Sequence, residues 1–149
     1  ASVAHQIEQS ARSVLDRVTV VGPGDRFNPG VPVSVIGQKH AVIHAELPHF
    51  DNSGYLLELD GRVLFHPGDA LTVPPGQVDL LCLPVSAPWL KISECIDYAR
   101  AVGAPRSLAI HDEIYSAVAL DIAAGHLQRF LEPMGLSYTR VNPGADFTF

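Results

Sequence analysis

The 149-residue sequence predicts an α/β fold in which helices cover one face of a mixed β-sheet. Its first half holds short apolar or β-branched runs that are separated by turn-forming clusters such as GPGD, NPG, HPGD and PPG. Its second half alternates apolar runs with two stretches whose apolar residues recur at helical spacing. A β-rich half followed by a β-α-β-α-β order predicts one layered domain over residues 1–149.

The first half is predicted to hold one short helix and then strands. Val3–Leu15 carries apolar residues at helical spacing, and Val78–Leu83 is a mostly apolar run typical of a strand covered on both faces. The other expected strands are Val18–Val21, Val31–Ile36, and a hairpin of Tyr55–Leu59 and Arg62–Phe65 around Asp60-Gly61.

The second half is predicted to hold two amphipathic helices. Ile92–Val102 has apolar residues at i, i+3, i+4 and i+7, and Gly103 is well placed to end it. Ser116 is a suitable N-cap for the second helix, Ala117–Leu131, which Pro133 stops. Because each helix has one apolar stripe, we expect both on the same face of the sheet. The remaining expected strands are Ser107–Ile110, Ser137–Val141 and Phe147–Phe149.

Composition excludes several function classes. The formal charge of −6 and the scattering of ten basic residues disfavour a nucleic acid as partner. No apolar run is long enough to span a bilayer, and the start of the sequence lacks the pattern of a secretory signal. Cys82 and Cys95 are too few for a disulfide framework, so we expect reduced core thiols and a cytoplasmic protein.

Three predicted strands are followed by side chains that bind metals. Asp69 ends the His66-Pro67-Gly68-Asp69 turn after one strand, His111 follows a second, and His40 closes the segment VSVIGQKH. In layered α/β folds, ligands gather outside the carboxyl ends of strands. Two imidazoles and a carboxylate suit Zn, Mn or Fe. The pattern therefore predicts a shared metal site at His40, Asp69 and His111.

A plainer interpretation stands beside this one. A histidine at a strand end is more often a surface or hydrogen-bonded residue, and Asp69 can serve only its own turn. His5 and His126 fall on predicted helices and are expected to be structural or exposed. The expected solvated acids are Asp97, Asp112 and Glu113, with Asp112 or Glu113 as an alternative partner that orients an imidazole.

The segment GYLLELDGRVLFHPGDAL resembles the stretch of metallo-β-lactamase-fold proteins in which a hairpin ends in a metal-bridging Gly-Asp. Three further segments resemble other parts of that fold. VSVIGQKH is similar to the strand before its isolated histidine, VDLLCLPV to its next core strand, and SLAIHDE to the strand before its last histidine. The N-SGY text resembles the lactonase-like, general metal-dependent hydrolase branch.

The resemblance implies an αββα layered fold, of which this sequence holds the C-terminal part. Asp69 is then the bridging and catalytic carboxylate, and His111 the terminal histidine. His40 is favoured as the middle ligand, followed by His49 and then His44. The implied reaction is hydrolysis of an ester, lactone or phosphoester in a small-molecule substrate by metal-bound hydroxide, with Zn, Mn or Fe as the metal.

The family's first motif, His-x-His-x-Asp-His, is absent, since the nearest text, HQIEQS, keeps only its first histidine. We therefore expect the N-terminal half of the fold to lie elsewhere or to be lost, and the isolated chain to be inactive. An exposed sheet face predicts a homo-oligomer. One alternative is a non-catalytic relic without bound metal that acts as a binding or self-associating domain. Another is an unrelated α/β binding domain.

Overall fold

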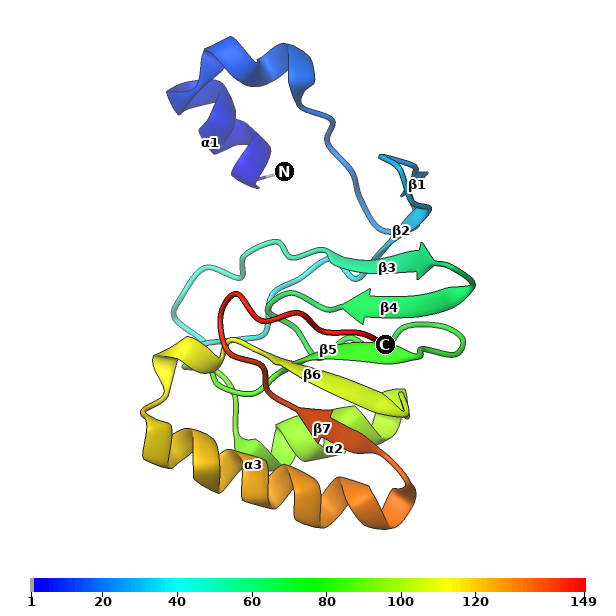
Figure 1. Cartoon of the computed structure of the whole chain (residues 1–149). Helices are drawn as coiled ribbons and strands as arrows, with labels where there is room; N and C mark the ends of the chain where they lie inside the picture. Colours follow the sequence, from blue (N-terminus) through cyan, green and yellow to red (C-terminus); the bar gives the residue numbers. More distant parts are fainter. Residues whose placement is uncertain (1) are drawn as a thin grey trace.

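The computed structural model describes residues 2–149, with side chains from residue 4 onward, and confirms the α/β class. A seven-stranded mixed sheet runs in the order β1 to β7, antiparallel from β1 to β4 and parallel from β4 to β7 (Figure 1). The strands are β1 (Arg26–Phe27), β2 (Val33–Ile36), β3 (Gly54–Leu59), β4 (Arg62–His66), β5 (Leu80–Pro84), β6 (Arg106–Ile110) and β7 (Ser137–Thr139).

Three α-helices and three 3₁₀ turns complete the chain. They are α1 (Ser2–Ser10), η1 (Arg12–Arg17), α2 (Ile92–Val102), η2 (Asp112–Ile114), α3 (Ala117–Leu131) and η3 (Glu132–Met134). The two predicted helices of the second half are found with their predicted bounds. Gly103 ends α2 in the left-handed conformation with φ 66°, and the Ser116 hydroxyl accepts a hydrogen bond from the Ala119 amide at the start of α3.

Both α2 and α3 pack on one face of the sheet, as predicted. Phe65 of β4 and Leu83 of β5 are fully buried in the same hydrophobic cluster as Cys95 of α2 and Leu131 of α3. The two helices lie side by side in Figure 1. Each Å² of buried apolar surface stabilises a fold by about 25 cal/mol, so this layer is the main source of stability.

Two predicted strands are wrong. Val18–Val21 is an extended connection without a strand partner, because residues 24–27 occupy the edge of β2 through the bonds Gly24 N–H to Val35 O and Val35 N–H to Asp25 O. Phe147–Phe149 is also irregular. Its rings stack instead on guanidinium groups, with Arg106 4.9 Å from the Phe147 ring centroid and Arg62 5.9 Å from that of Phe149.

The predicted helix over Val3–Leu15 is found as two pieces. It ends at Ser10 and continues as the 3₁₀ turn η1 after Ala11, which has φ −142° and leaves the helical conformation. In Figure 1 these pieces stand apart from the two main layers.

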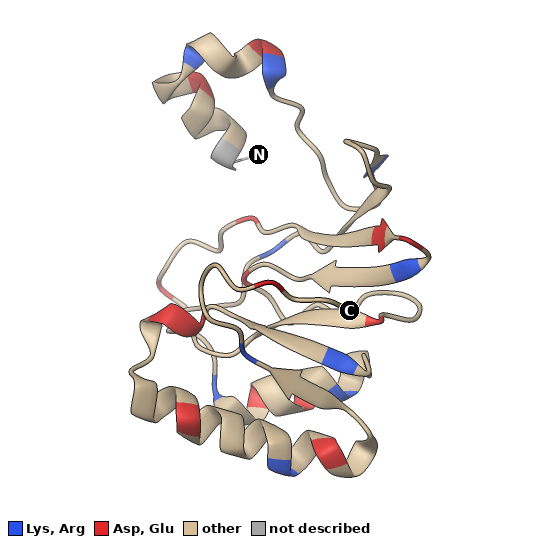
Figure 2. Ribbon diagram, in the orientation of Figure 1, with Lys and Arg blue, Asp and Glu red and all other residues tan. Residues whose placement is uncertain are grey.

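Charge is dispersed over the molecule. Figure 2 shows Lys and Arg interspersed with Asp and Glu on helices, strands and turns, with no continuous basic stripe on the visible ribbon. Among the described residues, no helix is both long and apolar enough to cross a membrane.

Both cysteines are free and buried, as predicted. Burial raises the pKa of Cys82 to about 11 and that of Cys95 to about 12, because the thiolate loses its solvation. We expect neither thiol to react with a disulfide reagent at pH 8 within an hour in the folded protein, and both to react at once in urea. Two fast-reacting thiols in the native protein would contradict the packing of β5 against α2.

The same shifts fix the direction of the pH dependence. In the unfolded chain the thiols ionise near their ordinary pKa, whereas in the folded chain they stay protonated to higher pH. Their stabilising contribution is therefore complete below pH 9 and is lost as the pH rises through the folded values of about 11 and 12. The free energy of unfolding, measured in urea, should fall by about 1 kcal/mol per thiol at pH 10.

Candidate metal centre

The side chains of His40, Asp69 and His111 meet at one carboxylate oxygen. His40 Nε2 lies 3.8 Å from Asp69 Oδ1, and His111 Nδ1 lies 3.5 Å from the same atom. The carboxylate is partly open to solvent, whereas the His40 side chain keeps only 16% of its surface exposed.

Sheet topology brings these residues together. β2 and β4 are both antiparallel to β3 and therefore run in the same direction, and β6 is parallel to β5, which is parallel to β4. The carboxyl ends of β2, β4 and β6 consequently lie at one edge of the sheet. His40 follows β2, Asp69 follows β4, and His111 follows β6. Residues 71 positions apart in the sequence, from 40 to 111, thus share one site.

The tautomer of the His40 ring follows from its neighbour Ala41. Its Nδ1 lies 2.5 Å from the Ala41 carbonyl oxygen, which can only accept, so Nδ1 carries the proton. In the neutral ring the lone pair is then on Nε2, the atom that faces Asp69. Edge contacts with the rings of Trp89 and Phe50, at centroid distances of 5.9 and 6.5 Å, hold the imidazole in place. Metal-binding histidines commonly have the same arrangement, in which the ring nitrogen away from the metal donates to a carbonyl or carboxylate oxygen and so fixes the tautomer.

Asp69 sits on a turn whose backbone makes several hydrogen bonds. Its N–H donates to Asn52 Oδ1 at 2.9 Å, and its carbonyl accepts from the Ala41 N–H at 2.7 Å. The preceding Gly68 has φ 67° and donates its N–H to His66 Nδ1 at 3.1 Å. A residue other than glycine would be strained in this conformation. The carboxylate is therefore presented from a fixed backbone.

His111 adopts a left-handed backbone conformation, with φ 63° and ψ 17°. For a residue with a side chain this conformation costs about 1–2 kcal/mol, and such residues cluster at functional sites. The hydroxyl of the fully buried Ser86 donates to the His111 carbonyl and stabilises the turn. The strand β6 thus ends in a bend that presents the imidazole toward Asp69.

Sequence reasoning overlooked His66 as a neighbour of the site. The pKa of His66 lies below its ordinary value of 6.5, first because burial removes solvent and then because His111 is close; its own backbone hydrogen bond and Asp69 oppose the shift. His66 Nδ1 accepts the Gly68 N–H, so a neutral ring carries its proton on Nε2. The sequence signal for this role is the place of His66 at the end of β4, three residues before Asp69.

The other histidines have different roles. His49 Nε2 donates to the His40 carbonyl oxygen at 2.7 Å, and His44 Nδ1 accepts from the Glu46 N–H at 3.2 Å. His49 therefore supports the segment that carries His40. His5 contacts Gln9 on α1, and His126 is exposed on α3.

Asp112 is not a solvated acid, contrary to the prediction. Its side chain is only 17% exposed, and its Oδ2 accepts a hydrogen bond from Arg140 Nε at 2.6 Å. This pair ties the turn after His111 to the segment after β7. Asp97 and Glu113 are exposed.

The donor set is suitable for a metal, although the site is not closed. Two ligands of one zinc ion, each about 2.1 Å from it, lie about 3.4 Å apart in a tetrahedral arrangement. The 3.5 Å separation between His111 and Asp69 is close to this value, and the 3.8 Å separation at His40 is longer. In residues 2–149, no three His, Cys, Asp or Glu side chains stand in the arrangement of a complete metal site. The role of these residues as ligands stays a prediction.

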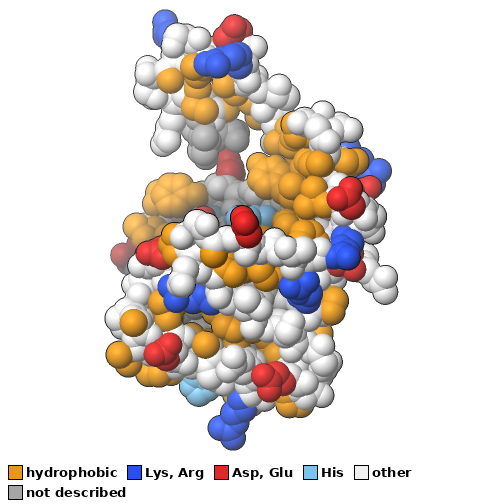
Figure 3. All heavy atoms as spheres, in the orientation of Figure 1, with side chains coloured by type: hydrophobic (Ala, Val, Ile, Leu, Met, Phe, Trp, Pro, Cys, Tyr) orange, Lys and Arg blue, Asp and Glu red, His pale blue; other side chains and the backbone are white. Residues whose placement is uncertain are grey.

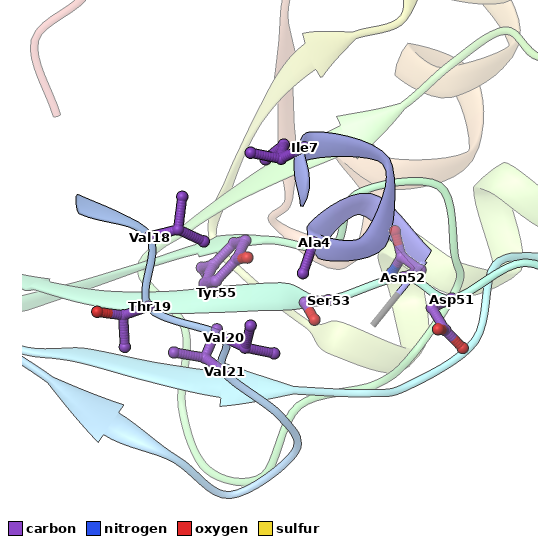
Figure 4. A pocket seen from close by; sticks show the side chains of 10 residues that line it. All are labelled: Ala4, Ile7, Val18, Thr19, Val20, Val21, Asp51, Asn52, Ser53 and Tyr55. Carbon is purple, nitrogen blue, oxygen red and sulfur yellow. The ribbon is translucent and has the colours of Figure 1, made fainter. Parts of the chain in front are cut away.

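Two hollows lie near this edge. A shallow one of about 420 Å³ is bordered by His40, Val42, Leu71 and Trp89, among others, and so adjoins the candidate site. Another, of about 280 Å³, lies between α1 and the start of β3, where Ile7, Val20 and Tyr55 point toward it (Figure 4). Figure 3 shows hydrophobic side chains on both sides of the depression between the N-terminal helices and the sheet.

Comparisons with known proteins found a related sequence and similar solved structures. Protein Rv0786c of Mycobacterium tuberculosis is 48% identical over 97 residues, which cover 64% of this chain and 46% of that protein. The crystal structure of a putative metal-dependent hydrolase from Parabacteroides distasonis superposes with a TM-score of 0.65 at 19% identity, over 87% of this chain and 60% of that one. Igni18, a metallo hydrolase from Ignicoccus hospitalis, gives a TM-score of 0.64 at 11% identity, over 100% of this chain and 73% of that one.

The family of this chain is shown by a match to a sequence model of that family. This chain spans less than half of the length of Rv0786c, and the two structures, at under 25% identity, show a shared fold. A sequence model of the family described as "Beta-lactamase superfamily domain" matches residues 1–111, which include the candidate site. The chain therefore belongs to the beta-lactamase superfamily, and its sheet and helices have the metallo-β-lactamase type of fold.

Proposed function

We propose that this chain carries part of the active site of a metal-dependent hydrolase. The observation that supports it is the convergence of two imidazole nitrogens on one Asp69 oxygen, at the carboxyl edge of the sheet in a member of this superfamily. Three protein ligands suffice for one zinc with an open position. His40, Asp69 and His111 are the proposed ligands, and Zn, Mn or Fe the proposed metal.

A metal held there would activate water and polarise the bond to be cleaved. The chain's own residues prepare that chemistry. His40 offers the lone pair of Nε2 because Ala41 accepts the Nδ1 proton. Asp69 offers its carboxylate from a turn fixed by Asn52 and Ala41. The proposed substrates are small esters, lactones or phosphoesters, and the shallow hollow beside His40 is a suitable place for the remainder of such a molecule.

A complete two-metal site needs more ligands than these three. In the proposed enzyme they come from a His-x-His-x-Asp-His segment that the 149 residues do not contain. The alternative is a non-catalytic domain that binds a partner or a second copy of itself, and it is favoured by the open ligand arrangement. A cytoplasmic location and a homo-oligomeric state remain part of the proposal.

Titration of the chain with Zn²⁺ tests the ligand assignment. We expect weak binding of one ion per chain, because three ligands and an open position are available. His111→Ala should weaken this binding at least tenfold, since it removes one of three ligands. His126→Ala is the matched control, because His126 is an exposed histidine on α3 and should leave the affinity unchanged.

The measurement is calorimetry, with metal content after desalting as a second readout. Equal affinities of the parent chain and His111→Ala would remove His111 from the site. If the parent chain binds no zinc at concentrations up to 1 mM, its binding free energy is weaker than about −4 kcal/mol. This result would favour the non-catalytic alternative.

A further inference from the structure

We propose that Asn52 is a positioning residue, which holds the turn of Asp69 in register with the segment of His40. This inference rests on the proposed function, since it concerns the same metal site. Asn52 lies two residues before β3 and lines the cavity shown in Figure 4. Its side chain is hydrogen-bonded to the turn after β4. It touches neither imidazole of the site in any hydrogen bond and acts through the backbone.

The amide of Asn52 makes two bonds to the turn that carries Asp69. Its Nδ2 donates to the Pro67 carbonyl oxygen at 2.8 Å, and its Oδ1 accepts the Asp69 N–H at 2.9 Å. One planar group thus uses its donor and its acceptor on two backbone groups on either side of Gly68. Only an amide of this length offers both functions at this spacing: a carboxylate lacks the donor, and a hydroxyl is shorter.

The backbone of Asn52 connects to the other half of the site. Its N–H donates to the Gln38 carbonyl at 3.0 Å, and the neighbouring Lys39 forms a bridge and a 2.7 Å ion pair with Asp51. The His40 N–H donates to the Phe50 carbonyl at 3.0 Å. Residues 50–52 are therefore hydrogen-bonded to residues 38–40, the segment that follows β2 and includes His40.

Gly68 shows how closely the Asn52 side chain packs against the turn. A Cβ atom on Gly68 would collide with Oδ1 of Asn52. The positive φ of 67° already disfavours a side chain there, so two independent features require glycine. The Asn52 side chain and the turn of residues 67–69 therefore fit each other, and a substitution in one should alter the position of the other.

These contacts give Asn52 a specific effect on the site. Without its amide, the Asp69 N–H and the Pro67 carbonyl lose their partners. The turn keeps the bond from the Ala41 N–H to the Asp69 carbonyl but loses its connection through Asn52 to residue 38. The 3.8 Å separation of Asp69 and His40 depends on both segments. Metal affinity should therefore fall more than the loss of stability alone explains.

The experiment compares Asn52→Ala with Asn28→Ala. Asn28 makes the same kind of bond, accepting the Gly30 N–H at 3.0 Å, in the loop between β1 and β2. It controls for the general loss of an asparagine that caps a loop. Two readouts are taken on each variant: the dissociation constant for Zn²⁺ alone, and the exchange rate of the Asp69 amide proton by NMR, which needs no metal.

We expect Asn52→Ala to raise the zinc dissociation constant about tenfold and to speed exchange of the Asp69 amide at least tenfold. Asn28→Ala should change neither. A second test places Gly68→Ala in both backgrounds. Because Asn52→Ala removes the atom that collides, Gly68→Ala should lower the melting temperature less in that background than in the parent chain.

The outcomes separate this inference from the proposed function. If the parent chain binds no zinc, the proposed metal site fails, while the amide exchange still decides whether Asn52 holds Asp69. If zinc binds and Asn52→Ala matches the parent in affinity and exchange, the positioning role is overturned. Equal effects of Asn52→Ala and Asn28→Ala on affinity would also overturn it, because they would reflect stability alone.

Discussion

Asp69→Ala is expected to abolish hydrolysis in a form of the protein that includes a His-x-His-x-Asp-His segment. The carboxylate is the group that both His40 and His111 approach. Its removal takes away one proposed ligand and leaves the two imidazoles without their common neighbour. Metal chemistry contributes several kcal/mol of charge stabilisation in the transition state, which corresponds to a loss on the order of 10³-fold in turnover. The measurement is turnover on a panel of lactones, esters and phosphodiesters, together with metal content.

Two comparisons make this result interpretable. Asp97→Ala, which removes an exposed carboxylate on α2, should leave turnover within twofold of the parent. The 149-residue chain alone should show little or no turnover, since it offers at most three ligands. Robust metal-dependent turnover by this chain, unaffected by Asp69→Ala, would place the chemistry elsewhere in the molecule.

Phe65→Ala should have the largest effect on stability. Phe65 is fully buried in β4, opposite Leu56 of β3, and its ring lies in the cluster formed with α2 and α3. A Cβ built on Gly54 would be 3.1 Å from Phe65 Cε2, so the ring also packs against the strand backbone. Truncation of a buried Phe costs about 3–5 kcal/mol, through lost burial and the cavity that remains. Urea unfolding followed by fluorescence or circular dichroism measures this loss.

Ile122→Ala on α3 is the control. Ile122 is 58% exposed, and its truncation should change the free energy of unfolding by no more than about 0.5 kcal/mol. A loss below 1 kcal/mol for Phe65→Ala would mean that the contact between the sheet and the two helices is loose.

Local patterns predicted the elements that carry their own signals. The Asp60-Gly61 turn, the stripe of Ile92–Val102 and the caps at Gly103 and Ser116 each specify a short segment from within, and all are found. The predicted strand Val18–Val21 is wrong because a strand also needs a partner, and residues 24–27 already pair with the edge of β2. β-propensity describes a surface that fits a sheet and does not specify the neighbour that completes it.

The candidate site was predicted only as far as strand ends reveal it. His40, Asp69 and His111 each follow a strand, and the direction of those strands brings them together. The supporting residues carry no such signal. Asn52 acts across 17 positions and Ser86 across 25, so their contacts arise from tertiary packing alone. Arg140 reaches Asp112 in the same way, across 28 positions.

The family match ends at residue 111, whereas the folded unit does not. Leu127 and Leu131 of α3 are fully buried in the cluster that covers β5, and Arg140 neutralises Asp112 directly beyond His111. A fragment of residues 1–111 would lack α3 and Arg140, and it would expose the part of this cluster, on α2, that α3 covers. Recombination or grafting of this module must therefore carry residues 112–149 along, although the family pattern assigns them no part in it.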